Sequence, residues 1–243
     1  MKMDSTNFFN VTTLQNHFNY DTIYIINIIS ACIGVIPSLM AIIFEQFWIF
    51  SVFCFSFIVA LIRAGISEKY ERNDYINILS IIDASCGVLI SLTIAISVKM
   101  YKTLFGILRI LWLVSVVTAS CSYAFFQTQT GASFLPNDVT LITLIVSSVL
   151  LFVAYIASKT GCLKNKSEET SIISELFLVL GAFVLRFDED IQNLLSVSFG
   201  VAFWHLCCWL SGIFLTVFLR NKQKEEARTR RFNAQRALTE NVL

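Results

Sequence analysis

The chain has 243 residues, of which 56% are hydrophobic and 14% are charged. A soluble domain carries charge on about a quarter of its residues, so this composition excludes an ordinary soluble protein and favours one that lies in lipid. The net charge of +1 creates no overall field that would attract nucleic acid, and we expect no nucleic-acid partner.

The first segment, residues 1–21, is polar and lacks the apolar stretch of a secretory signal peptide. The first apolar segment is therefore expected to serve as the targeting signal itself. Asn10-Val11-Thr12 is an N-glycosylation sequon, so Asn10 is a candidate glycosylation site if this tail lies on the extracellular or lumenal side.

Seven segments that follow are apolar enough for transmembrane helices, each of which needs about 20 residues. Helices are expected rather than strands because the apolar runs are long and lack period-two alternation. The predicted fold is thus an all-α membrane protein, a seven-transmembrane helix bundle over residues 22–219. Its expected spans are Thr22 to Phe44, Phe47 to Ile66, Tyr75 to Val98, Leu104 to Phe126, Val139 to Ser158, Ile172 to Phe187 and Leu194 to Leu219.

The placement of lysine and arginine predicts the orientation. With the N-terminus outside and the C-terminus in the cytosol, twelve of the 18 basic residues lie inside and five lie on the outer side, a count that includes Arg63 near the outer end of its span; Arg109 lies within a span. The cytosolic basic tail, residues 220–243, is expected to be helical. It either contacts anionic membrane lipids or is an ordinary stop-transfer cluster. The tail and the sequon suit either a plasma membrane or an endomembrane, and we prefer the plasma membrane.

Ionisable side chains at membrane depth are costly and usually face the bundle interior. Asp83 lies inside the third span, and Ser80 is one turn earlier on the same helical face. These two side chains form either a binding site or an anchor for a neighbouring helix. Arg63 lies at a similar depth in the second span. We therefore hypothesise an ion pair between Arg63 and Asp83, the alternative being that Arg63 extends to the outer interface.

Two further polar residues lie within the later spans. His205 is near the middle of the seventh span, with Cys208 three residues on and on the same face. It is either a hydrogen-bonded packing residue or, with that thiol, part of a metal site. Arg109 is only five residues from the cytosolic end of the fourth span, and we expect its side chain to extend to that interface.

Several stretches occur together in a recognisable order. They are Ile36 to Leu39, Phe57 to Gly65, Ser80 to Gly87, and Leu180 to Asp190 followed by Trp204-His205. Their order and spacing resemble the myomaker family and its larger relatives implicated in GPI-anchor processing. That family belongs to the CREST superfamily, with the alkaline ceramidases and the adiponectin and progestin receptors. The resemblance covers nearly the whole membrane domain, and the helix-six stretch is its most specific part.

The resemblance implies a zinc-dependent lipid hydrolase core. Relatives carry a histidine in helix two, a serine and an aspartate in helix three, and a His-x-x-x-His pair in helix seven. In this chain the helix-two position reads Ile62-Arg63, and the helix-seven pair reads Val201 and His205. Arg63 would then place a fixed cation where relatives hold a metal.

The positions that still match the resemblance define the candidate site. Ser80 and Asp83 are its candidate catalytic residues. Asp83, His205 and Cys208 are its candidate metal ligands, with Cys86 as another possible thiol. One histidine and one aspartate are too few for a closed zinc site unless a thiol contributes.

Three functions remain open. We favour a non-catalytic multipass protein without a cofactor, which acts through membrane lipids or a membrane-protein partner. The alternative is a divergent zinc-dependent hydrolase of an amide or ester bond in a membrane lipid or GPI anchor. A seven-helix receptor is disfavoured, because the expected outer loops 67–75 and 127–138 lack cysteine and helix three lacks the acidic-Arg-aromatic triplet of many such receptors. A transporter is disfavoured because no matching pair of broken helices occurs.

Overall fold

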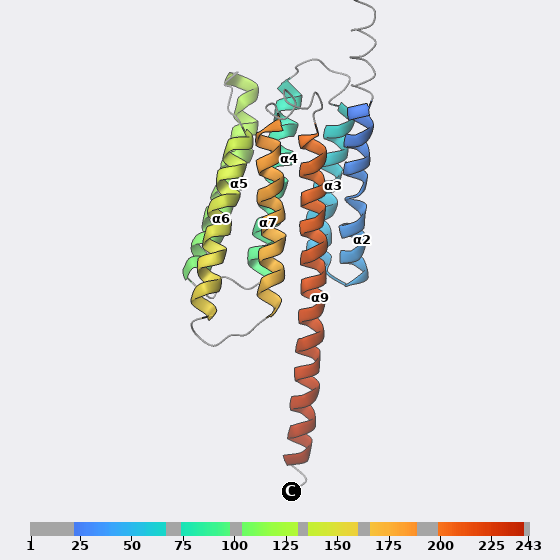
Figure 1. Cartoon of the computed structure of the whole chain (residues 1–243), viewed down its shortest axis with the longest axis vertical. Helices are drawn as coiled ribbons and strands as arrows, with labels where there is room; N and C mark the ends of the chain where they lie inside the picture. The colour runs from blue at the N-terminus through green and yellow to red at the C-terminus, as the bar shows by residue number, and fades with distance from the viewer. Residues whose placement is uncertain are drawn as a thin grey trace, which may run out of the picture.

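The computed structural model describes residues 22–66, 74–97, 104–130, 136–159, 166–188 and 199–240, and within these ranges every regular element is a helix. Residues 22–32 are helical. The helices that follow are α2 (Val35–Ile43), α3 (Phe47–Ile66), α4 (Asp74–Ser97), α5 (Leu104–Thr130), α6 (Pro136–Lys159), α7 (Lys166–Arg186) and α9 (Gly200–Glu240). They lie side by side in one bundle (Figure 1). The predicted all-α class is confirmed.

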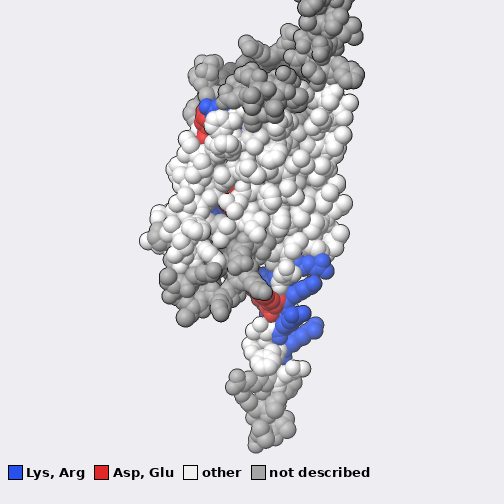
Figure 2. Space-filling view, viewed as in Figure 1, with Lys and Arg blue, Asp and Glu red and all other residues white. Residues whose placement is uncertain are grey.

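Four helical segments are long and apolar enough to cross a membrane. They are Thr22–Ile43, Phe47–Gly65, Ile78–Ser97 and Gly200–Gln235, and two shorter apolar helices cover Gly106–Ser120 and Asp138–Val153. The face of the bundle drawn in Figure 2 is largely free of charge. Large apolar side chains such as Ile43, Trp48 and Phe152 are more than half exposed there. Because water would solvate such a surface poorly, the chain is a multi-span membrane protein.

The first membrane segment is interrupted at residues 33–34, four residues before Pro37. Proline cannot donate a hydrogen bond to the carbonyl four residues earlier, and its ring crowds that carbonyl. A Cβ added to Gly34 would lie 2.7 Å from Cζ2 of Trp209. The break therefore occurs where the absence of a side chain lets the indole of Trp209 approach the backbone.

The turn between α2 and α3 lies against the part of α9 where that helix leaves the bundle. Gln46 Nε2 donates a hydrogen bond to the carbonyl oxygen of Thr216 at 3.3 Å. The guanidinium carbon of Arg220 lies 4.2 Å from the centroid of the Phe44 ring. Beyond this level α9 continues to Glu240 as one helix that projects from the bundle (Figure 1). The expected helical tail is thus continuous with the last span, and lysine and arginine gather near its start (Figure 2).

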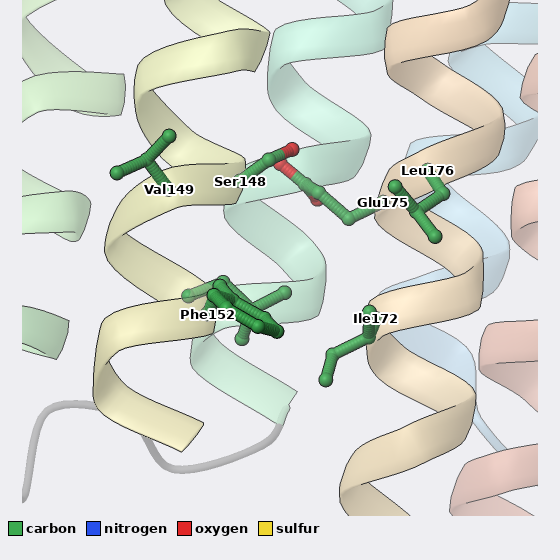
Figure 3. A pocket seen from close by; sticks show the side chains of 7 residues that line it. Ser148, Val149, Phe152, Ile172, Glu175 and Leu176 are labelled. Carbon is green, nitrogen blue, oxygen red and sulfur yellow. The ribbon is translucent and has the colours of Figure 1, made fainter. Parts of the chain in front are cut away.

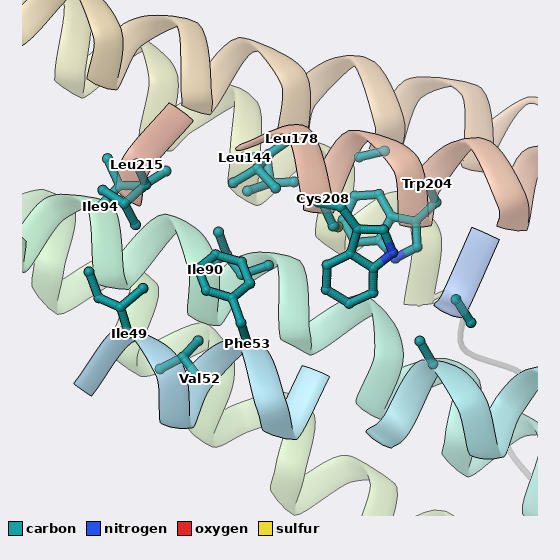
Figure 4. Packing of buried hydrophobic residues seen from close by; sticks show 14 of the residues in the cluster. Ile49, Val52, Phe53, Ile90, Ile94, Leu144, Leu178, Trp204, Cys208 and Leu215 are labelled. Carbon is teal, nitrogen blue, oxygen red and sulfur yellow. The ribbon is translucent and has the colours of Figure 1, made fainter. Parts of the chain in front are cut away.

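Small residues allow α9 to pack closely into the core. A Cβ added to Gly87 on α4 would lie 2.2 Å from Cη2 of Trp204, and one added to Gly181 on α7 would lie 2.7 Å from Cβ of Cys207. In lipid the hydrophobic effect contributes little to helix association, because lipid tails are as apolar as the side chains. Close van der Waals packing of this kind is what holds such helices together. The resulting cluster includes Trp204, Cys208 and Phe53 (Figure 4). This packing holds the face of α9 that carries His205 against α4.

Candidate functional site

An ion pair joins α3 to α4 inside the bundle. Arg63 Nη1 donates to Asp83 Oδ2, and the side chains of Arg63 and Asp83 are only 12% and 3% exposed. This is the pair hypothesised from the depths of the two residues along their spans. Since the guanidinium is largely withdrawn from the surface, Arg63 is held by the carboxylate rather than extended freely to the interface.

His205 of α9 lies on the other side of the same carboxylate. Its Nε2 is 3.4 Å from Asp83 Oδ1, and its Nδ1 is 3.3 Å from Ser30 Oγ. The histidine is 1% exposed. Both ring nitrogens therefore face oxygen atoms, and Asp83 lies between a guanidinium and an imidazole. Three helices, α3, α4 and α9, meet at this one carboxylate.

Ser30, from the helical segment 22–32, completes the cluster. Its hydroxyl donates to the carbonyl oxygen of Asn27 at 2.8 Å. Its own carbonyl oxygen accepts a hydrogen bond from Trp209 Nε1 at 2.8 Å. The Trp209 ring in turn stacks on His205, with centroids 6.3 Å apart. Sequence reasoning missed Ser30, because a single serine in an apolar span gives no signal of its partner 175 residues away.

The other residues expected at this site do not complete a metal centre. Cys208 and Cys86 are both buried, and Cys208 belongs to the hydrophobic core cluster. Ser80 is half-buried. Among the described residues, no group of three or more His, Cys, Asp and Glu side chains is arranged to hold a metal ion.

The donor set around Asp83 does not fit a zinc ion. One carboxylate oxygen is paired with the guanidinium of Arg63, which stays protonated in proteins. A zinc ion on Asp83 would lie beside this fixed cation, and the repulsion between the two charges would be strong at low dielectric. The arrangement suits a buried ionic clamp between helices.

A second buried ionic cluster contradicts the expectation for Arg109. This side chain does not extend to the cytosolic interface: it is 0% exposed and points into the bundle. Its Nη2 lies 2.9 Å from Glu175 Oε2, and its Nε donates to Ser147 Oγ at 2.8 Å. Glu175 supplies the countercharge that an arginine needs once it is buried. The depth of Arg109 along its own helix does not reveal this partner.

Two serine hydroxyls complete the second cluster around Glu175 Oε1. Ser91 Oγ donates to this oxygen at 2.6 Å, and Ser147 Oγ donates to it at 2.7 Å. Arg109 Nη2 also donates to Ser91 Oγ at 3.2 Å. The four residues come one each from α4, α5, α6 and α7. The cluster therefore ties α5, α6 and α7 to α4, the helix that also carries Asp83.

The end of the bundle opposite the α2–α3 turn carries further polar contacts. Arg186 Nε donates to Asp138 Oδ1, which pairs the end of α7 with the start of α6. Asp188 Oδ1 accepts a hydrogen bond from the backbone N–H of Gly200 at 2.7 Å, which caps α9. Arg186 and Asp188 thus each join the end of α7 to the start of another helix. Asn10, the glycosylation candidate, lies outside the described residues.

These features define a class: a multi-span helical membrane protein whose helices are joined by two buried ionic clusters. Comparison with protein-family models, with curated proteins and with solved structures finds no match for the chain.

Proposed function

We propose that this chain is a non-catalytic multipass membrane protein of the myomaker type, which acts through contacts with membrane lipids or with another membrane protein. The observation that carries the proposal is the ion pair between Arg63 and Asp83. By the resemblance, Asp83 is the carboxylate next to which relatives hold a metal. Here a guanidinium takes that place.

A guanidinium cannot replace zinc in hydrolysis. Zinc lowers the pKa of a bound water and polarises a carbonyl, whereas an arginine has no open coordination position and does not release its proton. Arg63 can only supply a fixed positive charge and orient the Asp83 carboxylate. The pairing thus supports a role in which the carboxylate and His205 fix helices in place.

The proposed topology is seven spans with the N-terminus outside and the C-terminus in the cytosol. It is supported by the contact of the α2–α3 turn with Thr216 and Arg220, which puts this turn and the start of the basic projection at one end of the bundle. It is also supported by the pair of Arg186 with Asp138 and the cap of Asp188, which lie at the opposite end. We place the protein in the plasma membrane.

A divergent zinc-dependent lipid hydrolase is the second candidate. It is favoured by one observation, the approach of His205 Nε2 to Asp83 Oδ1 at 3.4 Å. Two of the ligands expected from the resemblance are thus neighbours, and Cys208 follows His205 by one helical turn. Displacement of Arg63 from the carboxylate would be required before a metal could bind there.

A hydrolysis assay tests the proposed function. The full-length protein, purified in detergent with zinc added, would be incubated with a ceramide, a phospholipid and a GPI-anchored substrate. We expect no release of fatty acid above a protein-free sample, and the same result for wild type and Asp83→Asn. A zinc-dependent lipid hydrolase purified in parallel shows that the assay works. Release that disappears in Asp83→Asn or with a chelator would favour the hydrolase instead.

A further inference from the structure

A cavity of about 240 Å³ lies between α6 and α7, apart from the Asp83 cluster. The residues that line it include Ser148, Val149, Phe152, Ile172, Glu175 and Leu176 (Figure 3). Four of these six side chains are apolar, and the remaining two are polar. The cavity therefore has an apolar wall with a small polar end.

Unused hydrogen-bonding capacity is concentrated at the polar end. Ser148 Oγ is buried and has no hydrogen-bond partner among the described residues. Glu175 Oε2 lies 2.9 Å from Arg109 Nη2 but accepts no hydrogen bond of good geometry. The Ser148 and Glu175 side chains extend toward each other across the gap between the two helices (Figure 3). Buried polar atoms usually make a hydrogen bond, so the Ser148 hydroxyl without one, beside a carboxylate oxygen that still has room to accept one, points to a missing ligand.

The cavity opens sideways, toward lipid. Val149, Phe152 and Leu176 are 56%, 54% and 56% exposed, although each lines it. Glu175 is the tenth residue of the 21-residue helix α7, close to its middle. A few charged atoms are visible through the apolar flank of the bundle (Figure 2). Whatever enters this cavity comes from the hydrocarbon layer.

We propose that this cavity binds the hydroxyl end of an uncharged membrane amphiphile. The ligand's O–H would donate to Glu175 Oε2, and its oxygen would accept from Ser148. Arg109 already balances the charge of Glu175, so the site does not need a cationic headgroup. Its volume is below the ~300–1,000 Å³ of a drug-sized site, so the cavity admits one end of a lipid while the rest lies along the apolar flank.

This inference does not depend on the proposed function, because the cavity and the Asp83 cluster share no residue. The test uses a long-chain alcohol that carries a photoreactive diazirine and an alkyne, with the methyl ether of the same probe as a matched compound. Full-length protein in lipid nanodiscs would be irradiated with each, and the labelled peptides would be quantified by mass spectrometry.

We expect the alcohol to label α6 and α7 at the cavity about fivefold more than the ether, the ratio that one hydrogen bond gives. Ser148→Ala should reduce alcohol labelling toward the level of the ether. Leu176→Trp should abolish it by filling the cavity. Leu180→Trp is the control, because Leu180 is 47% exposed one turn further along α7 and does not line the cavity.

Both substituted positions on α7 are exposed to lipid, so these tryptophan variants should keep the fold, which gel filtration would check. Equal labelling by the alcohol and the ether would overturn the proposal. The proposal would also be overturned if Leu176→Trp and Leu180→Trp reduced labelling by the same factor. The probe would then report only the lipid around the helices.

Discussion

Replacement of Glu175 by alanine is expected to destabilise the bundle by about 3–5 kcal/mol, the cost of removing one partner from a buried ion pair. Arg109 is 0% exposed, so its charge would lose the carboxylate of Glu175 while remaining inside the bundle. Ser91 and Ser147 would also lose the oxygen to which both donate. Thermal unfolding of the purified protein in detergent, with its yield, measures this loss.

The matched control for Glu175→Ala removes both charges. Arg109→Met combined with Glu175→Met should be more stable than either single change, because apolar replacement of a whole buried pair is often neutral. Ser148→Ala is the second control, since Ser148 lies beside the cluster but makes no hydrogen bond within the described residues. If Glu175→Ala and Ser148→Ala unfold at the same temperature, the cluster does not hold the bundle.

Replacement of Asp83 by asparagine is expected to cost about 1–3 kcal/mol, the contribution of a charge-assisted hydrogen bond in a buried setting. The asparagine keeps the shape but loses the attraction for Arg63 and the contact with His205. The cost should be smaller than for Glu175, because the Arg63 side chain is 12% exposed and can extend to the interface once it is released.

A double-mutant cycle separates the Arg63–Asp83 pair from other effects of the substitutions. Arg63→Met, Asp83→Asn and their combination would be compared by thermal unfolding in detergent. We expect the combined variant to lose less than the sum of the two single losses, since each single change already breaks the same contact. Strictly additive losses would mean that the two side chains do not stabilise each other.

The Arg63–Asp83 pair could be predicted because the two residues lie on consecutive spans at similar depth. A short connection makes consecutive spans neighbours, so residues of opposite charge at one depth can meet. The Arg109–Glu175 pair could not be predicted in this way. It joins α5 to α7, and the packing of four helices decides which side chains face each other.

An error in helix length also concealed Glu175. The predicted sixth span begins at Ile172, which puts Glu175 in its first turn, where a carboxylate would reach water. In the structure α7 begins at Lys166, so Glu175 lies near the middle of the helix. Hydropathy identifies only the apolar part of a helix. Because α7 begins with polar residues, its start was predicted six residues too late. For Arg109 the helix start was predicted correctly, at Leu104. The position of a residue along its helix does not show which way its side chain points, and Arg109 points into the bundle.

Zinc content tests directly whether the Asp83 cluster is an ionic clamp or a metal centre. Elemental analysis of detergent-purified full-length protein would give zinc per chain for wild type and for His205→Ala. We predict well below one zinc per chain, unchanged by the substitution. Near-stoichiometric zinc in wild type that is lost in His205→Ala would contradict the account and show that the metal site survives with substituted ligands.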